Sequence, residues 1–176
     1  KNYAMLISSN AGLWRYMIGD TVRFTEKKPY RFKITGRTKN FINACGEELI
    51  VDNAIKAIET ACRLTDSSVN EYTAAPLFDT QRNTTLHQWL MEFEKEPEDM
   101  MRFTETFDKA IQDVNSDYEA KRYKNFVLQM PMVKSVPQGT FYKWLKSKGK
   151  LGGQHKVPRL SNSRDYIEEI LKLLEQ

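Results

Sequence analysis

The first candidate for chemistry is a carboxylate that directly follows a glycine at the end of an apolar run. Asp20 comes after Gly19 in the segment Leu13-Trp-Arg-Tyr-Met-Ile-Gly-Asp. A carboxylate there can accept two hydrogen bonds from neighbouring hydroxyl groups, as carboxylates do with the ribose of a nucleotide. Glycine followed by aspartate is also an ordinary turn, and local sequence alone favours the turn. Asp20 is therefore a candidate nucleotide ligand that needs support from a second feature.

That second feature is a pair of segments further along the chain. Gly36-Arg37-Thr38-Lys39-Asn40-Phe41-Ile42 is followed by Gly46-Glu47-Glu48-Leu49, which precedes a helical pattern. Together with the segment ending at Asp20, these are more specific than any one alone. Further motifs stand in a fixed order around them, namely Tyr30-Arg-Phe-Lys-Ile-Thr-Gly-Arg, His87-Gln-Trp-Leu-Met-Glu-Phe, Gly139-Thr-Phe-Tyr-Lys and His155-Lys-Val-Pro-Arg.

In this order the segments resemble the paired signature of acyl-adenylate-forming enzymes, in which Gly-Asp is followed by an aromatic-rich strand, Gly-Arg, a hinge and a Gly-Glu turn. In detail they are similar to bacterial members of the auxin-responsive-promoter family of acyl-acid amido synthetases, relatives of the plant hormone-conjugating enzymes. The resemblance extends from about Tyr3 to Leu174. It implies an ATP-dependent ligase: ATP and an acyl acid give an acyl-adenylate and pyrophosphate, and an amino-acid amine then attacks the adenylate to form an amide.

The resemblance implies roles for five residues. Asp20 would bind the ribose hydroxyls of ATP, and Arg37 would contact ribose or phosphate. Thr38 and Lys39 would form the hinge between a large domain and a mobile C-terminal domain. Lys156 would be the catalytic lysine that reaches the α-phosphate and stabilises negative charge as pyrophosphate leaves, a role that suits a compact ammonium. From local sequence alone, Lys156 would be a solvated lysine in a basic loop.

Other parts of such an enzyme are not found in this sequence. No Gly-rich phosphate loop is present, and the adenine pocket and acyl-binding cleft are also lacking. The resemblance therefore implies that residues 1–38 are the last strands of a larger, missing N-terminal domain and that residues 39–176 form the C-terminal domain. The missing domain is the expected partner. It would hold most of the ATP and Mg²⁺ and select the carboxylic acid and amino acid substrates, so the chain alone is not expected to be active.

Two further expectations concern residues without an assigned role. No metal ligands are predicted within this chain. Plant members of the family carry a basic residue soon after the hinge, where this chain has Glu47 and Glu48. No role in recognising the acceptor amino acid is therefore transferred to these two glutamates.

Periodicity predicts an α+β fold that would position the candidate residues. Short strands are expected at 4–7, 15–18, 22–24, 30–35, 69–77, 87–93 and 126–136, with Pro131 marking an edge or a bulge in the last one. Helices are expected at 51–64, from Pro97 to near Asn115, at 140–148, and after a cap at Ser163. This order predicts a short β meander followed by a small mixed sheet covered by helices.

The charge pattern supports two alternative functions. From Pro131 to Arg164 the chain has no acidic residue but eight cations: Lys134, Lys143, Lys146, Lys148, Lys150, Lys156, Arg159 and Arg164. Such a basic block attracts phosphate, either on a nucleotide or on a nucleic-acid backbone. With Phe141, Tyr142 and Trp144 it could form a nucleic-acid face. Trp89 and Trp144 could stack bases, although each stands in an apolar pattern that core packing also explains. The other alternative is a domain that binds a protein partner without nucleotide.

Composition excludes several classes of protein. A chain of 176 residues, 40% hydrophobic with 8 Gly and 6 Pro, has the composition of a folded domain with room for a small extra segment. It contains no apolar stretch long enough for a membrane helix and begins without a signal-peptide pattern, so a cytoplasmic location is expected. Cys45 and Cys62 are too few for a disulfide framework and are expected to be reduced, with Cys62 in the core. His87 and His155 are too few for a His-rich metal site.

Overall fold

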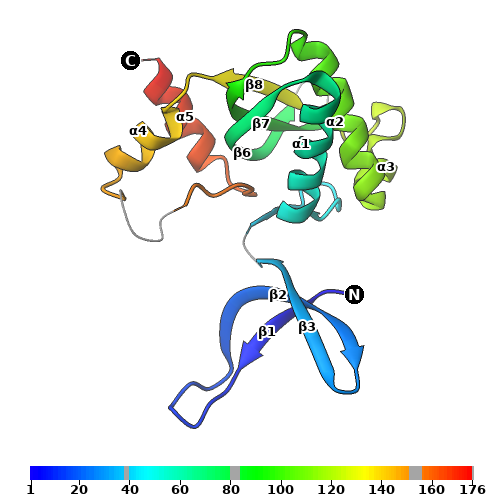
Figure 1. The fold of residues 1–176 in the computed structure, drawn as a ribbon, viewed down its shortest axis with the longest axis vertical. Coiled ribbons are helices and arrows are strands. Elements are labelled where there is room, and N and C mark those ends of the chain that lie inside the picture. The colour runs from blue at the N-terminus through cyan, green and yellow to red at the C-terminus, as the bar shows by residue number, and fades with distance from the viewer. Residues whose placement is uncertain (38–39, 80–83, 151–155, 176) are drawn as a thin grey trace.

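The N-terminal residues form a three-stranded antiparallel sheet that stands apart from the remainder of the chain (Figure 1). The computed structural model describes residues 1–37, 40–79, 84–150 and 156–175. The first sheet contains, in spatial order, β1 (Tyr3–Ile7), β2 (Tyr16–Lys27) and β3 (Tyr30–Arg37). The two short strands expected at 15–18 and 22–24 are one continuous strand, because Gly19 lies inside β2 at a φ of 88° rather than between two strands.

This β1–β3 sheet has almost no core of its own. Val22 is the one buried residue among the described side chains of residues 1–35. The large apolar side chains around it are exposed: Tyr3, Leu6, Leu13, Trp14, Tyr16, Met17, Ile18, Phe24, Tyr30, Phe32 and Ile34. An exposed apolar surface of this kind is typical of a contact with another protein surface.

The larger unit is built around a second sheet. Its strands are β6 (Ser68–Asp79), β7 (Thr84–Lys95) and β8 (Met132–Val136), with β7 in the centre. The β6–β7 pair is antiparallel and the β7–β8 pair is parallel, so the sheet is mixed. The other elements are β4 (Phe41–Ile42), β5 (Leu49–Ile50), α1 (Val51–Thr65), α2 (Met100–Val114), α3 (Ser116–Arg122), the 3₁₀ turn η1 (Tyr123–Asn125), α4 (Thr140–Ser147) and α5 (Asp165–Leu174).

Helices cover both faces of this sheet (Figure 1). Alternate residues of β7 point to opposite faces, so Trp89 packs with α1 and α2 while its neighbour Leu90 packs with α4 and α5. On the first face the rings of Trp89 and Phe107 meet edge to face at 4.8 Å. Coverage on both sides explains why every residue from His87 to Phe93 is buried, which a strand exposed on one face would not show.

The α+β architecture expected from the sequence is confirmed, with differences at several boundaries. The helices expected at 51–64, up to Asn115, and at 140–148 are present as α1, α2 and α4. The last helix begins at Asp165, and Ser163 Oγ accepts a hydrogen bond from the Asp165 N–H one position before the observed N-cap. Across the described ranges, no helix is both long enough and apolar enough to cross a membrane.

The strand expected over 126–136 is wrong in its first half. Only Met132–Val136 forms a ladder strand, and Phe126 is exposed. Pro131 has no N–H to give to a neighbouring strand, so the ladder begins directly after it. Before it, Leu128 touches the sheet through a single bridge to Thr85.

Helix α3 was not expected from the sequence. It starts at the Asn115 cap, whose side-chain oxygen accepts a hydrogen bond from the Tyr118 N–H at 2.9 Å. It carries Asp117 and Glu119 near its start and Lys121 and Arg122 near its end, as the helix dipole favours. With only seven residues it has too short an apolar stripe to be found by periodicity.

Candidate functional site

Asp20 and Arg37, the two predicted nucleotide ligands, are brought together by strand pairing. They lie directly opposite each other across β2 and β3, at the end of the sheet where β3 stops. The Asp20 side chain is half-buried. Because opposite residues of an antiparallel pair lie about 5 Å apart, one ligand can contact both positions.

The other predicted site residues belong to the part of the chain beyond β3. Thr38 and Lys39, the predicted hinge, lie outside the described residues. Lys156 is described and exposed. It opens an extended segment, residues 156–162, which we refer to as the lysine segment and which runs beside β6 rather than beside Asp20 and Arg37.

The backbone of the lysine segment is fixed although Lys156 itself is exposed. The next residue, Val157, is buried with Leu90 in the core between the sheet and α5. The Thr73 hydroxyl donates to the Pro158 carbonyl at 2.7 Å. Ala74 N–H donates to the Arg159 carbonyl at 2.9 Å, and Ser161 N–H donates to the Ala74 carbonyl at 3.0 Å. The segment therefore continues the sheet beyond β6 and presents Lys156 to solvent from a fixed base.

A buried hydrogen-bonded pair, missed by the sequence analysis, holds the Gly-Glu turn against the sheet. Glu47 and His87 are both fully buried, and His87 Nε2 lies 2.8 Å from Glu47 Oε1. The carboxylate also accepts hydrogen bonds from the N–H groups of Ala44 at 3.0 Å and Cys45 at 2.6 Å. Among the described residues, His87 Nδ1 has no hydrogen-bond partner.

The electrostatics of this pair favour a charged glutamate. Burial alone would raise the pKa of Glu47, but the hydrogen bonds from His87, Ala44 and Cys45 outweigh burial and lower that pKa to about 2. Glu47 is therefore an ionised acceptor, and His87 Nε2 carries the proton between them. Burial has the opposite result at the half-buried Cys45, where it raises the pKa of the thiol. Both cysteines are half-buried and free of disulfides.

Each residue of the Glu47–His87 pair stands in a motif that the sequence analysis had singled out, the Gly-Glu turn and the strand expected at 87–93. A glutamate that follows a tight turn and a histidine within a strongly apolar strand both need polar partners if they are buried. The two residues are 40 positions apart, and no spacing rule joins them. The sequence therefore identified both segments but not the contact between them.

A second buried polar cluster joins α2 to α3. Asp108 accepts hydrogen bonds from the Tyr118 hydroxyl at 2.7 Å and from Arg122 Nε at 2.8 Å and Nη2 at 2.7 Å. Arg122 also donates to the Leu128 carbonyl at 2.9 Å. Burial and the Asp108 charge raise the pKa of Tyr118 well above its ordinary value. The cluster fixes the segment that leads to β8, and nothing in its geometry exposes a reactive group.

The basic block is less available to nucleic acid than its sequence suggests. Lys148 binds Glu169 at 2.7 Å, Arg164 binds Glu168 at 2.6 Å, and Arg159 lies 3.5 Å from Glu71. Of its three aromatic residues, Phe141 and Trp144 are buried in the core and Tyr142 is exposed. Trp89 is fully buried as well. A flat face that stacks bases would need several of these rings at the surface.

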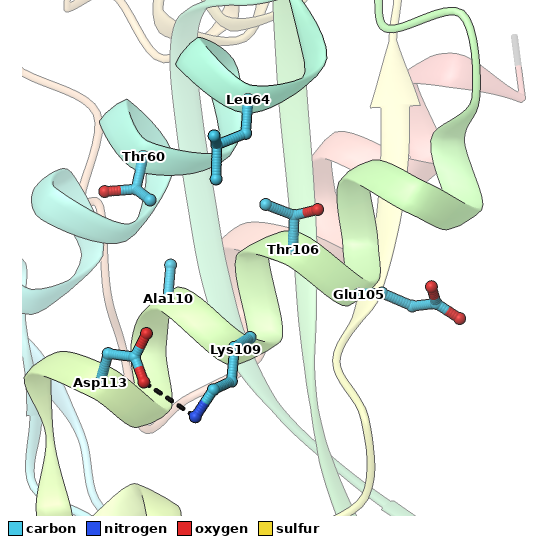
Figure 2. A pocket seen from close by; sticks show the side chains of 7 residues that line it. All are labelled: Thr60, Leu64, Glu105, Thr106, Lys109, Ala110 and Asp113. Atoms are coloured by element: carbon cyan, nitrogen blue, oxygen red, sulfur yellow. Dashed lines mark ion pairs between the residues drawn. The ribbon is translucent and has the colours of Figure 1, made fainter.

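A surface groove between α1 and α2 contains none of the predicted site residues. Figure 2 shows Thr60 and Leu64 of α1 on one side and Thr106 and Ala110 of α2 on the other. Lys109 and Asp113 form an exposed ion pair along its edge at 2.8 Å. The residues that the structure describes include no group of three or more His, Cys, Asp or Glu side chains placed to hold a metal ion.

Comparison with known proteins gives the same family for both parts of the chain. Residues 1–37 match the GH3 family central domain, and residues 52–165 match the GH3 family C-terminal domain. The indole-3-acetic acid-amido synthetase GH3.4 of Arabidopsis thaliana is 25% identical over 99% of this chain, which covers 30% of that protein.

Two solved structures share the fold. One is a GH3.15 acyl acid amido synthetase, with a TM-score of 0.73, 23% identity and coverage of 99% of this chain and 33% of that one. The other is the AtGH3.15 acyl acid amido synthetase in complex with 2,4-DB, with a TM-score of 0.72, 18% identity and coverage of 97% and 32%. The chain thus spans about a third of the length of the relatives it matches.

Proposed function

Since the chain belongs to the GH3 family, we propose that it is the C-terminal part of an ATP-dependent acyl-acid amido synthetase. The complete enzyme would activate a carboxylic acid as an acyl-adenylate and transfer the acyl group to the amine of an amino acid. The observation that carries this proposal is the order of the two family matches along one chain, with Asp20 and Arg37 paired in the first part and Lys156 in the second.

The reaction has two steps. In the first, a carboxylate oxygen of the acid attacks the α-phosphorus of ATP, and pyrophosphate leaves with the electron pair of the broken bond. In the second, the nitrogen of the amino acid attacks the acyl carbon, AMP leaves, and the amine loses a proton. Asp20 would accept hydrogen bonds from the ribose hydroxyls, and Arg37 would contact ribose or phosphate. Lys156 would lie near the α-phosphate in the first step and stabilise its developing charge.

We further propose that residues 39–176 move as one domain relative to residues 1–38. The lysine segment pairs with β6 through Leu160 and Ala74, whereas Asp20 and Arg37 pair across β2 and β3 in the other sheet. This separation supports an arrangement in which Lys156 approaches the nucleotide for adenylation and withdraws for amide formation. The rotation would take place at Thr38 and Lys39.

The exposed apolar surface of the β1–β3 sheet supports the proposal that a large domain covers it in the complete enzyme. Eleven large apolar side chains are exposed there around a single buried one, Val22. We propose that this sheet is part of the N-terminal domain of the complete enzyme. That domain would hold most of the ATP and the Mg²⁺.

Acid-dependent exchange of pyrophosphate into ATP by the complete protein tests this function. The assay omits amino acids and screens small aryl and alkyl carboxylic acids, so that only the first step runs. We expect exchange that requires an acid, and subsequent addition of amino acids should release AMP and form an amide. A folded complete protein that shows no exchange with any acid would contradict the proposal.

Lys156→Ala in the complete protein tests the assigned lysine. Loss of an electrostatic contact to a developing charge typically lowers the rate about 10²- to 10³-fold, and we expect a loss of this order in the exchange rate. Lys150→Ala, in the same basic block, is the matched control and should retain exchange. An unchanged rate in Lys156→Ala would mean that a different cation assists the first step.

A further inference from the structure

One side chain connects the lysine segment to the residues that follow the proposed hinge. Asn162, at the end of the lysine segment, accepts a hydrogen bond from the Asn43 N–H at 2.8 Å through Oδ1. Its Nδ2 donates to the Phe41 carbonyl at 3.2 Å. The amide of Asn162 thus pairs with the backbone on both sides of Ile42, as a neighbouring strand would, and uses both its donor and its acceptor.

The segment that Asn162 contacts is itself firmly held. Phe41–Asn43, which we refer to as the post-hinge segment, includes β4, whose Ile42 is fully buried and pairs with Leu49 of β5. A few residues later, the Glu47–His87 pair fixes the same loop to β7. Asn115 Nδ2 adds a hydrogen bond to the Glu47 carbonyl at 2.9 Å. The post-hinge segment is therefore attached to the sheet independently of Asn162.

The lysine segment is held on its other side by β6. Its hydrogen bonds to Thr73 and Ala74 and the burial of Val157 fix it from residue 157 to residue 161. Asn162 is the described side chain that links this segment directly to the post-hinge segment by hydrogen bonds. Because Asn162 is exposed, its replacement should remove these contacts without opening a cavity in the core.

We propose that Asn162 is a positioning residue for adenylation. It holds the end of the lysine segment, which β6 fixes only as far as Ser161, to the post-hinge segment, and so gives the lysine segment a second point of attachment close to the hinge. This inference rests on the proposed function, since it concerns how Lys156 reaches the α-phosphate. It adds a residue that contacts neither ATP nor the acyl acid in its assigned role and that acts through Lys156.

Asn162→Ala in the complete protein provides the test. The measured quantities are kcat and KM for ATP in acid-dependent ATP–pyrophosphate exchange. Loss of two exposed hydrogen bonds should lower kcat by about five- to tenfold and leave KM for ATP unchanged, since Asn162 does not bind the nucleotide. Asn162→Asp keeps the acceptor for the Asn43 N–H and loses the donor to the Phe41 carbonyl. Because its second carboxylate oxygen would face the Phe41 carbonyl and repel it, Asn162→Asp should not restore wild-type kcat.

A double-mutant cycle separates positioning from a general structural role. In a Lys156→Ala background, Asn162→Ala should cause no further decrease in kcat, because the group that it positions is already absent. Ser163→Ala is the matched control, since Ser163 Oγ accepts only the local Asp165 N–H among the described contacts and should leave kcat unchanged. An equal decrease with and without Lys156, an equal decrease in Ser163→Ala, or wild-type kcat in Asn162→Ala would each overturn the inference.

Hydrogen exchange measured by mass spectrometry distinguishes failure of this inference from failure of the proposed function. In the complete protein, Asn162→Ala should speed exchange in the peptide that contains the Asn43 N–H, and Ser163→Ala should not. No change in that peptide would overturn the inference while leaving wild-type adenylation intact. Absence of acid-dependent exchange of pyrophosphate in the wild type would instead overturn the proposed function, and the inference with it.

Discussion

Asp20 and Arg37 are direct partners in the antiparallel pairing of β2 and β3, at the last residue of β3. This pairing joins two residues that lie 17 positions apart in the sequence and places these candidate ligand positions side by side. It also places both at the end of the sheet that leads into the proposed hinge.

Asp20→Asn in the complete protein should weaken the use of ATP. A charged acceptor of two ribose hydrogen bonds is replaced by a neutral one, so KM for ATP in the exchange assay should rise at least about tenfold. KM for the acyl acid should not change. Glu26→Gln, near the opposite end of β2 and paired with Arg31 at 3.4 Å, is the matched control. Equal effects of the two substitutions would indicate damage to the sheet rather than loss of a ligand.

Glu47→Gln should destabilise the chain although it barely changes the volume of the side chain. The buried carboxylate that accepts hydrogen bonds from His87, Ala44 and Cys45 becomes neutral and loses one acceptor. We expect a decrease in the free energy of unfolding of about 2 to 3 kcal/mol in urea at pH 7. Glu48→Gln, at the exposed neighbouring position, should stay close to wild type. Equal stability of Glu47→Gln and wild type would show that the pair contributes nothing net.

The stabilisation from Glu47 should also depend on pH. Its pKa is lowered from 4.5 to about 2 in the folded chain, so the unfolded state binds the proton first as the pH falls. The contribution, about 3 kcal/mol from this shift, is complete above pH 4.5 and is lost as the pH falls through about 2. The stability difference between wild type and Glu47→Gln should therefore shrink over this range in urea unfolding curves. A difference that stays constant down to pH 2 would contradict the depressed pKa.

Arg122→Ala should be among the most destabilising single substitutions in the chain. It leaves the Asp108 carboxylate, which is only 8% exposed, without its cation, and breaking such a buried pair costs about 3 to 5 kcal/mol. Lys109→Ala, one position after Asp108 on α2, removes only the exposed pair with Asp113 and should change stability little. Thermal and urea unfolding of both variants provide the comparison. Similar losses for the two would refute the assignment of Arg122 to a structural cluster.

The chain should not bind nucleic acid through its basic block. Since Phe141 and Trp144 are buried and Lys148 and Arg164 are paired with glutamates, we expect no saturable binding of single-stranded DNA or RNA below about 100 µM at physiological salt. Fluorescence anisotropy with labelled oligonucleotides measures this directly. Tight binding that weakens steeply with added salt would favour the nucleic-acid alternative.

The sequence predicted those elements whose signals are local. Helix α2 begins where Pro97, Glu98 and Asp99 indicate, and Asp99 caps it by accepting hydrogen bonds from the N–H groups of Met101 and Arg102. Helix α1 was found because its apolar residues recur on one face. Helix α3 was missed because its stability comes from the Asn115 cap and from contacts of Tyr118 and Arg122 with Asp108, and contacts of this kind leave no periodic pattern.

The site could be predicted only in its separate parts. The Gly-Asp and Gly-Arg segments predicted Asp20 and Arg37 as ligands, but the pairing of these two positions across β2 and β3 follows from the hairpin between them. Glu47 with His87 and Asn43 with Asn162 join positions far apart in the chain, and such contacts are set by how the sheet and its crossing segments pack. The roles assigned to Asp20, Arg37, Lys156, Thr38 and Lys39 remain predictions.

The contact between Asn43 and Asn162 spans 119 positions, which has a consequence for synthesis on the ribosome. At a translation rate of about 5 to 20 residues per second, Asn162 is synthesised about 6 to 24 s after Asn43. During that interval the edge of β6 at Ala74 lacks the neighbour that the lysine segment later supplies. An unpaired edge invites pairing with other chains, so nascent chains stopped before residue 157 should aggregate more readily than completed ones.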